Sequence, residues 1–356
     1  MRKLQRILVF PAWSDNPYLN LMSLAPRAAG FEFKGVTTSR SLFDASSLLD
    51  AGDVLHLHWT APILQREPTL EAAAAALESF RTLLAEMKAR GVRLIWTIHN
   101  QLPHEVPYRE AEISLYRLLA TSADAIHIMS PQTPTVLKDI CELPADRLVE
   151  IPHPSYVGVY GSPMSRVDAR ASFDLADDEP TVLFLGQMRP YKGLGVLLAA
   201  LSRLAEEGKR TPTVLLAGAA TPEVQAEIEE ALPEGVRVIP RYEFVPDAEV
   251  GQWFAAADLA VFPYQAILNS GSLHLSASFG VPAVLPGEAH LVEQFSDEPW
   301  VGFFDPEDAV PSLASLLESI PEARDHVARI EDFNAAITPW RVSEQYAALL
   351  RDLVAR

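Results

Sequence analysis

The chain has 356 residues, of which 49% are hydrophobic and 21% charged, as is typical of a globular protein with two domains. Its net charge is −18, and even the more neutral part, residues 1–160, holds 15 Lys and Arg against 17 Asp and Glu, so a nucleic-acid-binding protein is not expected. The single cysteine, Cys141, excludes an intrachain disulfide, and no apolar run approaches the ~20 residues of a membrane-spanning helix. These features favour a cytoplasmic protein.

The first half of the chain alternates apolar strands with helical stretches. Residues 6–10 predict a first strand rather than a signal peptide, because the apolar run ends at Pro11. A long helix is predicted at residues 71–91. Further strands are predicted at residues 53–59, 93–100 and 125–130.

The second half repeats this pattern. Strands are predicted at residues 181–186, 213–218, 236–240, 259–264 and 282–286, with helices between them. A stretch rich in Pro, Gly and Ser separates the halves at residues 151–166, and an amphipathic helix closes the chain after Pro339. Two βα series predict an α/β protein with two doubly wound parallel sheets, which bind ligands beyond the carboxyl ends of their strands.

The strongest chemical motif is FLGQMRPYKGLGVLLAAL, residues 184–201. A strand ends at Gly186, the loop supplies Arg189 and Lys192, and Gly193 begins a helix. Two cations beside a helix N-terminus favour binding of a diphosphate. The spacing differs from that of a P-loop. The alternative is that both are solvated loop charges, and the position after a strand favours binding.

A second candidate anion site begins the helix after the strand at 259–264. Asn269, Ser270, Gly271 and Ser272 stand together there without a carboxylate. Backbone N–H groups and hydroxyls at a helix start can hold phosphate oxygens, and glycine permits close approach. A helix N-cap is the simpler interpretation, but one such residue would suffice for it. We therefore predict a second cradle for the same diphosphate.

The first half holds the candidate acid–base residues. His58 and His99 lie at the ends of predicted strands, and His104 and Glu105 follow in a loop, where such groups suit proton transfer. The three histidines could instead suggest a metal, but neither an HxxxH helix pair nor a cysteine ligand supports zinc, so no metal site is predicted. His56 and His127 are interpreted as hydrogen-bonded strand histidines.

The loop after the first strand supplies a rival base, Asp15, whose simpler role is to make a turn. Polar and aromatic residues that follow strand ends in this half are further candidate binding residues: Asn16, Tyr18, His58, Trp59 and Asn100.

Taken together, these motifs resemble those of a known family. The motif at 184–198, AAADLAVFPY and the SG…GxP stretch resemble the donor-binding half of GT-B fold glycosyltransferases, and the closing helix resembles the one that returns to their first domain. More narrowly, NPYL, GDVLHLHW, TIHNQLPHE, MRPYKG and NSGSLHLSAS, in this order, resemble bacterial exopolysaccharide β-mannosyltransferases of the xanthan-pathway type. The resemblance spans nearly the whole chain.

The resemblance implies a fold, a donor and a stereochemical course. The fold would be GT-B, with two Rossmann-like domains facing a cleft: an acceptor domain at 1–160 plus 339–356 and a donor domain at 161–338. The donor would be GDP-mannose, bound without a metal or other cofactor. Retaining enzymes of this fold usually carry two glutamates eight residues apart, and the matching positions here are Ile267 and Leu275. Inversion is therefore expected.

The resemblance also suggests roles for individual residues. Glu105 would be the base, with His99 or His104 orienting the sugar or sharing the proton, and Asp15 would be the rival. The nucleotide-sugar site would comprise Gly186, Arg189, Lys192, Arg241, Tyr242, Phe244, Tyr264, Asn269, Ser270, Gly271 and Ser272, of which 241, 242 and 244 stand where such enzymes hold the base of the nucleotide.

Several alternatives stay open at this stage. A retaining or UDP-sugar-dependent transferase has the same fold, and a non-catalytic nucleotide-sugar binder would bind without forming product. The expected partners are a nucleotide sugar and a saccharide acceptor, either a soluble glycoside or a lipid-diphosphate oligosaccharide met at the inner face of the cell membrane. The sequence does not distinguish these acceptors.

Overall fold

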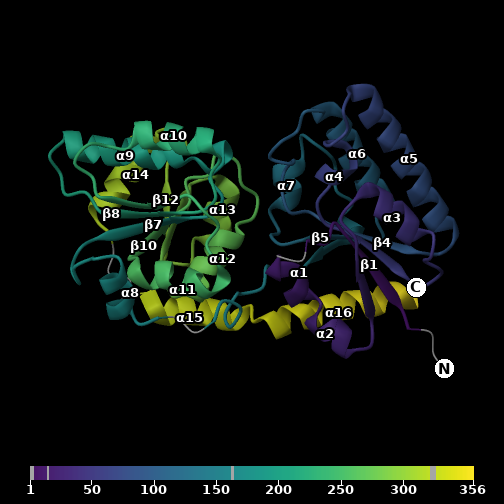
Figure 1. Ribbon diagram of the computed structural model, residues 1–356. Coiled ribbons are helices and arrows are strands. Elements are labelled where there is room, and N and C mark those ends of the chain that lie inside the picture. Colours follow the sequence, from purple (N-terminus) through teal and green to yellow (C-terminus); the bar gives the residue numbers. More distant parts are fainter. Residues whose placement is uncertain (1–3, 14–15, 162–163, 321–325) are drawn as a thin grey trace. The chain divides into compact units, whose positions relative to one another are not determined.

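The computed structural model describes residues 4–13, 16–161, 164–320 and 326–356, which form two compact units (Figure 1). Unit 1 comprises Met1–Pro154 and Pro339–Arg356, and unit 2 comprises Ser155–Thr338. The second unit begins at Ser155, whereas the sequence predicted that the second domain begins at residue 161. Residues 155–160 belong to unit 2 because Tyr156 N donates to Ser278 Oγ (2.8 Å) and the ring of Tyr160 contacts that of Phe279.

Unit 1 is built on a parallel sheet with the strand order β2-β1-β3-β4-β5-β6. Its strands are β1 (Arg6–Phe10), β2 (Glu32–Gly35), β3 (Val54–Leu57), β4 (Arg93–Thr97), β5 (Ala125–Ile128) and β6 (Leu148–Glu150). Its helices are α1 (Pro17–Met22), α2 (Leu24–Ala28), α3 (Ser39–Ser46), α4 (Ala61–Leu64), α5 (Leu70–Ala89), α6 (Arg109–Ser122), α7 (Thr133–Leu137) and α16 (Pro339–Ala355). Helices α5 and α6 lie on one side of the sheet, and α1, α2 and α16 lie on the other (Figure 1).

Unit 2 has a second parallel sheet, with the order β12-β11-β10-β7-β8-β9. Its strands are β7 (Thr181–Leu185), β8 (Thr213–Ala217), β9 (Val238–Arg241), β10 (Leu259–Val261), β11 (Ala283–Pro286) and β12 (Val301–Phe304). Its helices are α8 (Arg166–Ser172), α9 (Leu194–Glu206), α10 (Pro222–Ala231), α11 (Asp247–Ala256), α12 (Gly271–Ser278), α13 (Ala289–Phe295), α14 (Ala309–Glu318) and α15 (Val327–Ala336).

The core of unit 2 lies on both faces of its sheet, because successive strand residues point to opposite sides. On β7, Leu183 packs into the apolar cluster beneath α11, α12 and α15, while Val182 and Phe184 pack into the cluster beneath α9 and α14 (Figure 1). Neighbouring strands continue this register, with Leu183 opposite Leu215 of β8 and Ala260 of β10. The central strands are therefore apolar throughout, as parallel strands covered on both faces must be.

The closing helix belongs to unit 1. It packs against α1 and α2, where Ala25 N donates to Ser343 Oγ at 3.2 Å. Tyr346 lies fully buried on the same helix, with its hydroxyl 2.6 Å from Nδ1 of His56 on β3. The last 18 residues thus complete a unit that the first 154 begin.

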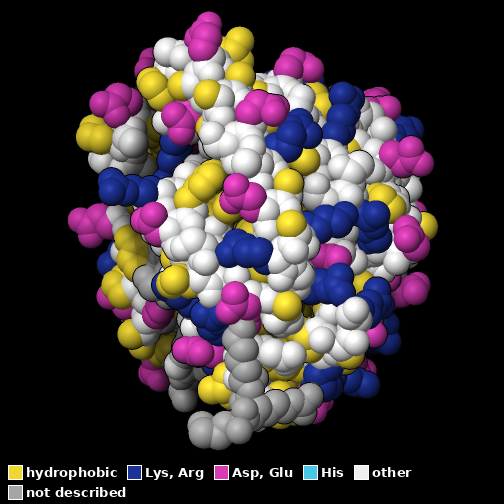
Figure 2. Space-filling model, turned by 90° about the vertical axis from the view of Figure 1, so that its right-hand side faces the viewer, with side chains coloured by type: hydrophobic (Ala, Val, Ile, Leu, Met, Phe, Trp, Pro, Cys, Tyr) yellow, Lys and Arg dark blue, Asp and Glu magenta, His cyan; other side chains and the backbone are white. Residues whose placement is uncertain are grey.

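Basic and acidic side chains are interspersed over the face of the molecule in Figure 2. The lysine and arginine side chains gather toward one half of that view, with carboxylates among them. Within the described residues, no helix is both long enough and apolar enough to cross a membrane.

Candidate functional site

Each sheet has one point where its strand order reverses. In unit 2, β8 and β9 extend the sheet from one side of β7, and β10 joins β7 on the other. In unit 1 the reversal lies between β1 and β3. At such a point, the segments that follow the two neighbouring strands diverge and leave a crevice between them. This crevice is the usual ligand site of such sheets. The residues predicted to bind the diphosphate follow β7 and β10, and Asn16, Tyr18, His58 and Trp59 follow β1 and β3.

The segment after β7 is fixed against its neighbours by glycines. Gly193 has φ +68°, and a Cβ there would lie 1.8 Å from the carbonyl oxygen of Pro263, which follows β10. At Gly218 a Cβ would lie 2.0 Å from the carbonyl oxygen of Gly186, whose own φ is +140°. Only glycine allows backbones to pass this closely. The contact at Gly193 brings the residue before it, Lys192, next to the segment after β10.

Lys192 lies in a hydrogen-bonded chain with two residues of that segment. Its Nζ donates to Tyr264 Oη at 3.0 Å and lies 4.4 Å from the centre of the Tyr264 ring, and Tyr264 Oη donates to Ser272 Oγ at 2.8 Å. Burial by itself lowers the pKa of Lys192, but Tyr264 and Tyr191 outweigh it, and the net pKa lies above the ordinary value. The ammonium therefore stays charged and fixed in position.

The structure argues against the alternative interpretation of these two cations. As solvated loop charges Arg189 and Lys192 would be exposed, but both are half-buried. Lys192 is packed because the close contact of Gly193 with Pro263 draws its side chain against Tyr264. A fixed cation of this kind suits a diphosphate better than a mobile surface lysine, because it needs little reorganisation on binding.

The small polar residues before α12 divide their roles. Ser270 is the N-cap of α12, and its Oγ accepts from Leu273 N at 3.1 Å, so capping accounts for this hydroxyl. Ser272 joins the chain from Lys192, while Gly271 begins the helix and Asn269 is half-buried just before it. The first N–H groups of a helix have no partner within it and favour anions. The arrangement can therefore bind phosphate oxygens.

The residues assigned to the nucleotide base follow β9, next to β8. Arg241 is ion-paired with Glu249 of α11. The ring of Tyr242 packs against the apolar cluster beneath α9, and burial raises the pKa of its phenol. Phe244 is 70% exposed. Phe244 thus presents a ring that a planar base can stack on, whereas the other two are held within unit 2.

The two positions that would carry glutamates in a retaining enzyme are apolar. Ile267 is 5% exposed, and Leu275 packs against the apolar cluster beneath α11 and α12. The carboxylates of that pattern are therefore replaced here by packed side chains.

In unit 1, buried histidines form a directed chain of hydrogen bonds. His127 Nε2 lies 2.9 Å from the carbonyl oxygen of Ile151, which can only accept, so Nε2 carries the proton and Nδ1 accepts from Thr97 Oγ1 at 2.9 Å. Thr97 in turn accepts from His56 Nε2 (2.7 Å), and His56 Nδ1 accepts from Tyr346 Oη. Both histidines are neutral, and burial lowers the pKa of each, that of His127 to about 4. The structure confirms their interpretation as hydrogen-bonded strand histidines.

The carboxyl ends of β1, β3 and β4 carry an aromatic group made of Trp13, Tyr18, His58, Trp59 and His99. Trp59 stacks on His99 with ring centres 4.1 Å apart, and Trp13 contacts Trp59 at 4.8 Å. Tyr18 meets the rings of His58 and His99 edge-on. Flat aromatic faces with polar edges are suited to a sugar ring, whose C–H faces are apolar and whose hydroxyls project outward.

His58 and His99 are joined directly, with Nδ1 of the first 3.0 Å from Nε2 of the second. Burial, followed by the neighbouring histidines, lowers the pKa of each well below the ordinary value. Both rings are therefore neutral near pH 7, which leaves them able to share a proton rather than to act as fixed cations.

The remaining predicted residues lie on loops near these strand ends. His104 and Glu105 are exposed, and His104 Nε2 lies 3.2 Å from Asn100 Nδ2. Asn16 caps α1 by accepting from Tyr18 N at 3.0 Å. Asp15 lies outside the described residues.

The sequence interpretation overlooked Trp13 of this aromatic group and one residue in contact with the group, His153. Trp13 follows β1, and His153 follows β6 with its ring 5.1 Å from that of Tyr18. Both come shortly after a strand end, the signal that identified the other members. His153 was missed because the strand before it, β6, is a short strand at the margin of the sheet, with three half-exposed or exposed residues.

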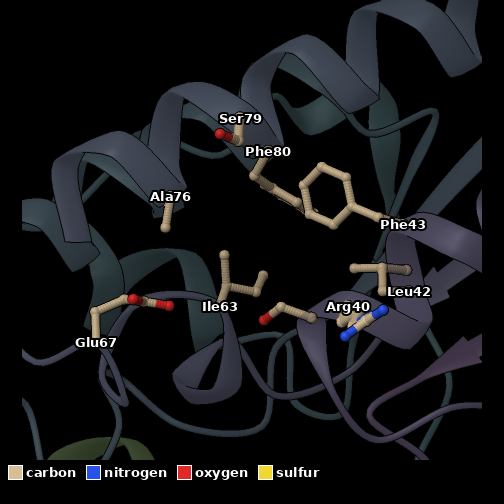
Figure 3. A pocket seen from close by; sticks show the side chains of 9 residues that line it. Arg40, Leu42, Phe43, Ile63, Glu67, Ala76, Ser79 and Phe80 are labelled. Carbon is tan, nitrogen blue, oxygen red and sulfur yellow. The ribbon is translucent and has the colours of Figure 1, made fainter. Parts of the chain in front are cut away.

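A further cavity of about 310 Å³ in unit 1 lies between α3, α4 and α5. Its lining is mainly apolar, with Ala76 and Ile63 pointing toward each other and Arg40 and Glu67 at its sides (Figure 3). None of the predicted site residues lines this cavity. Across the described residues, no three His, Cys, Asp or Glu side chains gather in an arrangement that could hold a metal.

The chain is similar in sequence to a known protein family and to a known enzyme. Residues 179–320, most of unit 2, match the family "Glycosyl transferases group 1". The GDP-mannose:glycolipid 4-beta-D-mannosyltransferase of Xanthomonas campestris pv. campestris is 26% identical over 328 residues, covering 88% of this chain and 82% of that protein.

Two solved structures have a similar fold. The sucrose-phosphate synthase of Thermosynechococcus elongatus superposes with a TM-score of 0.73 at 17% identity, covering 99% of this chain and all of that one. HepE of Anabaena, in complex with UDP-glucose, superposes with a TM-score of 0.70 at 14% identity, covering 98% of this chain and all of that one. The similarity in fold therefore extends over both units.

Proposed function

We propose that this chain, a GT-B glycosyltransferase with a group 1 glycosyltransferase domain in unit 2, transfers mannose from GDP-mannose to a glycolipid-linked saccharide with inversion at the anomeric carbon. The support for the donor and acceptor class is the similarity to the Xanthomonas enzyme, whose name specifies GDP-mannose and a glycolipid. The observation that carries the proposal is the charged chain of Lys192, Tyr264 and Ser272 where the strand order of unit 2 reverses.

The donor-binding role follows from the charge that develops in the reaction. When the bond between the anomeric carbon and the diphosphate breaks, its electron pair goes to the phosphate oxygen. Lys192 and Arg189, with the amides at the start of α12, would stabilise this charge as it forms, by preorganised electrostatics. Phe244 would stack on the base of the nucleotide.

Inversion requires a single displacement from the face opposite the diphosphate. The absence of carboxylates at positions 267 and 275 supports this course, because the packed Ile267 and Leu275 leave no acidic group in the pattern of retaining enzymes. The acceptor oxygen would form a bond to the anomeric carbon as the diphosphate leaves, and a base would take the hydroxyl proton.

We assign that base to Glu105 and assign positioning of the acceptor to the aromatic group of unit 1. Glu105 is an exposed carboxylate on the loop after β4, the strand that also leads to His99. His99, held by Trp59 and His58, would orient the acceptor sugar or share the proton, and Asp15 is the rival base.

Glu105→Gln separates these possibilities because it removes the base but keeps the size of the side chain. We expect at least a hundredfold loss in kcat, since general-base catalysis contributes about 10²–10⁴-fold, with unchanged binding of GDP by calorimetry. The control is Glu110→Gln, another exposed carboxylate early in α6. Full activity in Glu105→Gln together with loss in Asp15→Asn would transfer the role to Asp15.

The donor is tested by calorimetric titration with GDP-mannose, UDP-glucose and ADP-glucose. The proposal predicts that GDP-mannose binds tightest, by at least tenfold. Tightest binding of UDP-glucose would refute the donor assignment. Binding without any transfer to a glycolipid acceptor would instead indicate a non-catalytic nucleotide-sugar binder.

A further inference from the structure

A third strand end lies beside the two that hold the candidate diphosphate site. In the order of the sheet, β11 is next to β10, which is next to β7, and all three run parallel. Their carboxyl ends therefore lie side by side. After β11, Gly287 N donates to Phe304 O at 2.7 Å, and Glu288 follows immediately before α13.

The local structure does not explain why a glutamate stands at this position. Glu288 is the N-cap of α13, but its side chain makes no capping hydrogen bond, and glutamate is not a favoured N-cap residue. Its side chain is only 27% exposed, and this burial raises the pKa of the carboxyl group. In the described part of the chain, no lysine or arginine lies within ion-pair distance of it. Burial of a carboxylate is costly when it is neither paired nor hydrogen-bonded, and a ligand that donates hydrogen bonds would offset this cost.

His290, two residues later, is oriented by the segment that leads to α12. Its Nε2 lies 3.0 Å from the carbonyl oxygen of Ile267, which can only accept, so Nε2 carries the proton. Burial lowers the pKa of this histidine, and the ring is therefore neutral near pH 7, with Nδ1 as an acceptor. That Nδ1 lies 3.7 Å from Glu288 Oε2, beyond hydrogen-bonding distance.

Two hydrogen-bond acceptors thus stand side by side without a donor between them. The other strand ends of this site present the opposite chemistry, with the ammonium of Lys192 and the amides at the start of α12 as donors to an anion. A carboxylate would repel a phosphate, so Glu288 is not part of the diphosphate site. The two acceptors need a hydrogen-bond donor, and each hydroxyl group of a sugar can supply one.

We propose that Glu288 and Nδ1 of His290 accept hydrogen bonds from hydroxyl groups of the sugar that is transferred, and so form the sugar part of the donor site. This inference rests on the proposed function of unit 2 as a nucleotide-sugar site. It divides the three strand ends by chemistry: β7 and β10 supply donors for the diphosphate, and β11 supplies acceptors for the sugar.

The test compares a nucleotide sugar with its own nucleoside diphosphate, so that the two parts of the site are measured separately. In Glu288→Gln we expect calorimetry to show GDP-mannose binding at least tenfold weaker and GDP binding within twofold of the unchanged protein, because a hydrogen bond to a charged group is lost only with the sugar. Glu288→Asp keeps the charge but moves it away from the sugar. Its affinity for GDP-mannose is expected to lie between those of Glu288→Gln and the unchanged protein. The control is Glu293→Gln, an exposed glutamate of the same helix, which should alter neither affinity.

The outcomes separate this inference from the identity of the donor. If the unchanged protein prefers a UDP-sugar, the GDP-mannose assignment fails, and the same comparison is made with that sugar and UDP. Equal weakening of sugar nucleotide and nucleoside diphosphate in Glu288→Gln, or weakening of neither, would overturn the role of Glu288. A protein that binds every nucleoside diphosphate as tightly as its sugar derivatives would overturn it as well.

Discussion

Replacing Lys192 by methionine tests the diphosphate site most sharply. The substitution keeps the length and most of the apolar contact of the side chain but removes the charge that Tyr264 fixes at 3.0 Å. The Lys192 ammonium lies over the Tyr264 ring and is half-buried, so solvent screens it less than a surface charge. Two unit charges at about 4 Å interact by about 4 kcal/mol at an effective dielectric constant of 20.

That value is the upper bound on the transition-state stabilisation lost in Lys192→Met. The lower bound is the loss of one charge-assisted hydrogen bond, about 2 kcal/mol. Each 1.36 kcal/mol is a factor of ten, so kcat/KM should fall roughly 30- to 900-fold. Initial rates of mannose transfer measure the effect, and thermal unfolding checks that the fold is retained. The control is Lys209→Met, an exposed lysine that pairs with Glu207 and Glu318 at the end of α9.

Lys209→Met should leave kcat/KM within about twofold, since a solvated surface ion pair contributes little. A folded Lys192→Met protein with kcat/KM within threefold of the original would refute the assignment of the diphosphate to this chain of residues. Arg189 would then be the next candidate, with Lys192 left as a packing contact.

Two further predictions concern stability. Neutral His127 has a pKa of about 4 in the folded protein and about 6.5 when unfolded, so the unfolded state binds the proton first and stability falls as the pH drops from 6.5 toward 4. The free energy of unfolding, measured with urea, should be lower at pH 5 than at pH 7.5, and this residue should account for about 2 kcal/mol of the difference. His127→Asn should reduce the difference between the two pH values. An unchanged difference in that variant would contradict the directed chain of hydrogen bonds. Gly193→Ala should destabilise by more than about 2 kcal/mol, because its Cβ would meet Pro263 O at 1.8 Å and φ is +68°. Gly195→Ala, in α9 with open space around it, should instead stabilise by about 0.5–1 kcal/mol, as chemical denaturation can show.

The sequence was most informative about central strands and least about marginal ones. The apolar runs at β7, β8, β10 and β11 were predicted because strands covered on both faces must be apolar throughout. The strands β2, β6 and β12 were not predicted, and each lies at the margin of its sheet. The residues of β2 are largely exposed, so their sequence carries no continuous apolar signal.

The sequence suggested individual candidate residues of the site but not their pairings. Lys192 and Tyr264 were both assigned to the donor, yet their contact depends on β10 lying beside β7, which the order of the elements along the chain does not specify. Trp59 was assigned to the acceptor and Trp13 was overlooked, and the two rings meet because β1 and β3 are neighbours. Glu288 gave no sequence signal, because its carboxylate becomes noteworthy only once its burial and lack of a cation are known.

The most direct test of the central claim is the configuration of the product. The protein is incubated with GDP-mannose, in which the mannose is α-linked, and a lipid-diphosphate oligosaccharide as the acceptor. The one-bond carbon–hydrogen coupling at the new anomeric carbon is then measured by NMR. We predict transfer of mannose and a β-linked product, since a single displacement inverts the anomeric carbon. An α-linked product, or transfer from UDP-sugars and not from GDP-mannose, would contradict it.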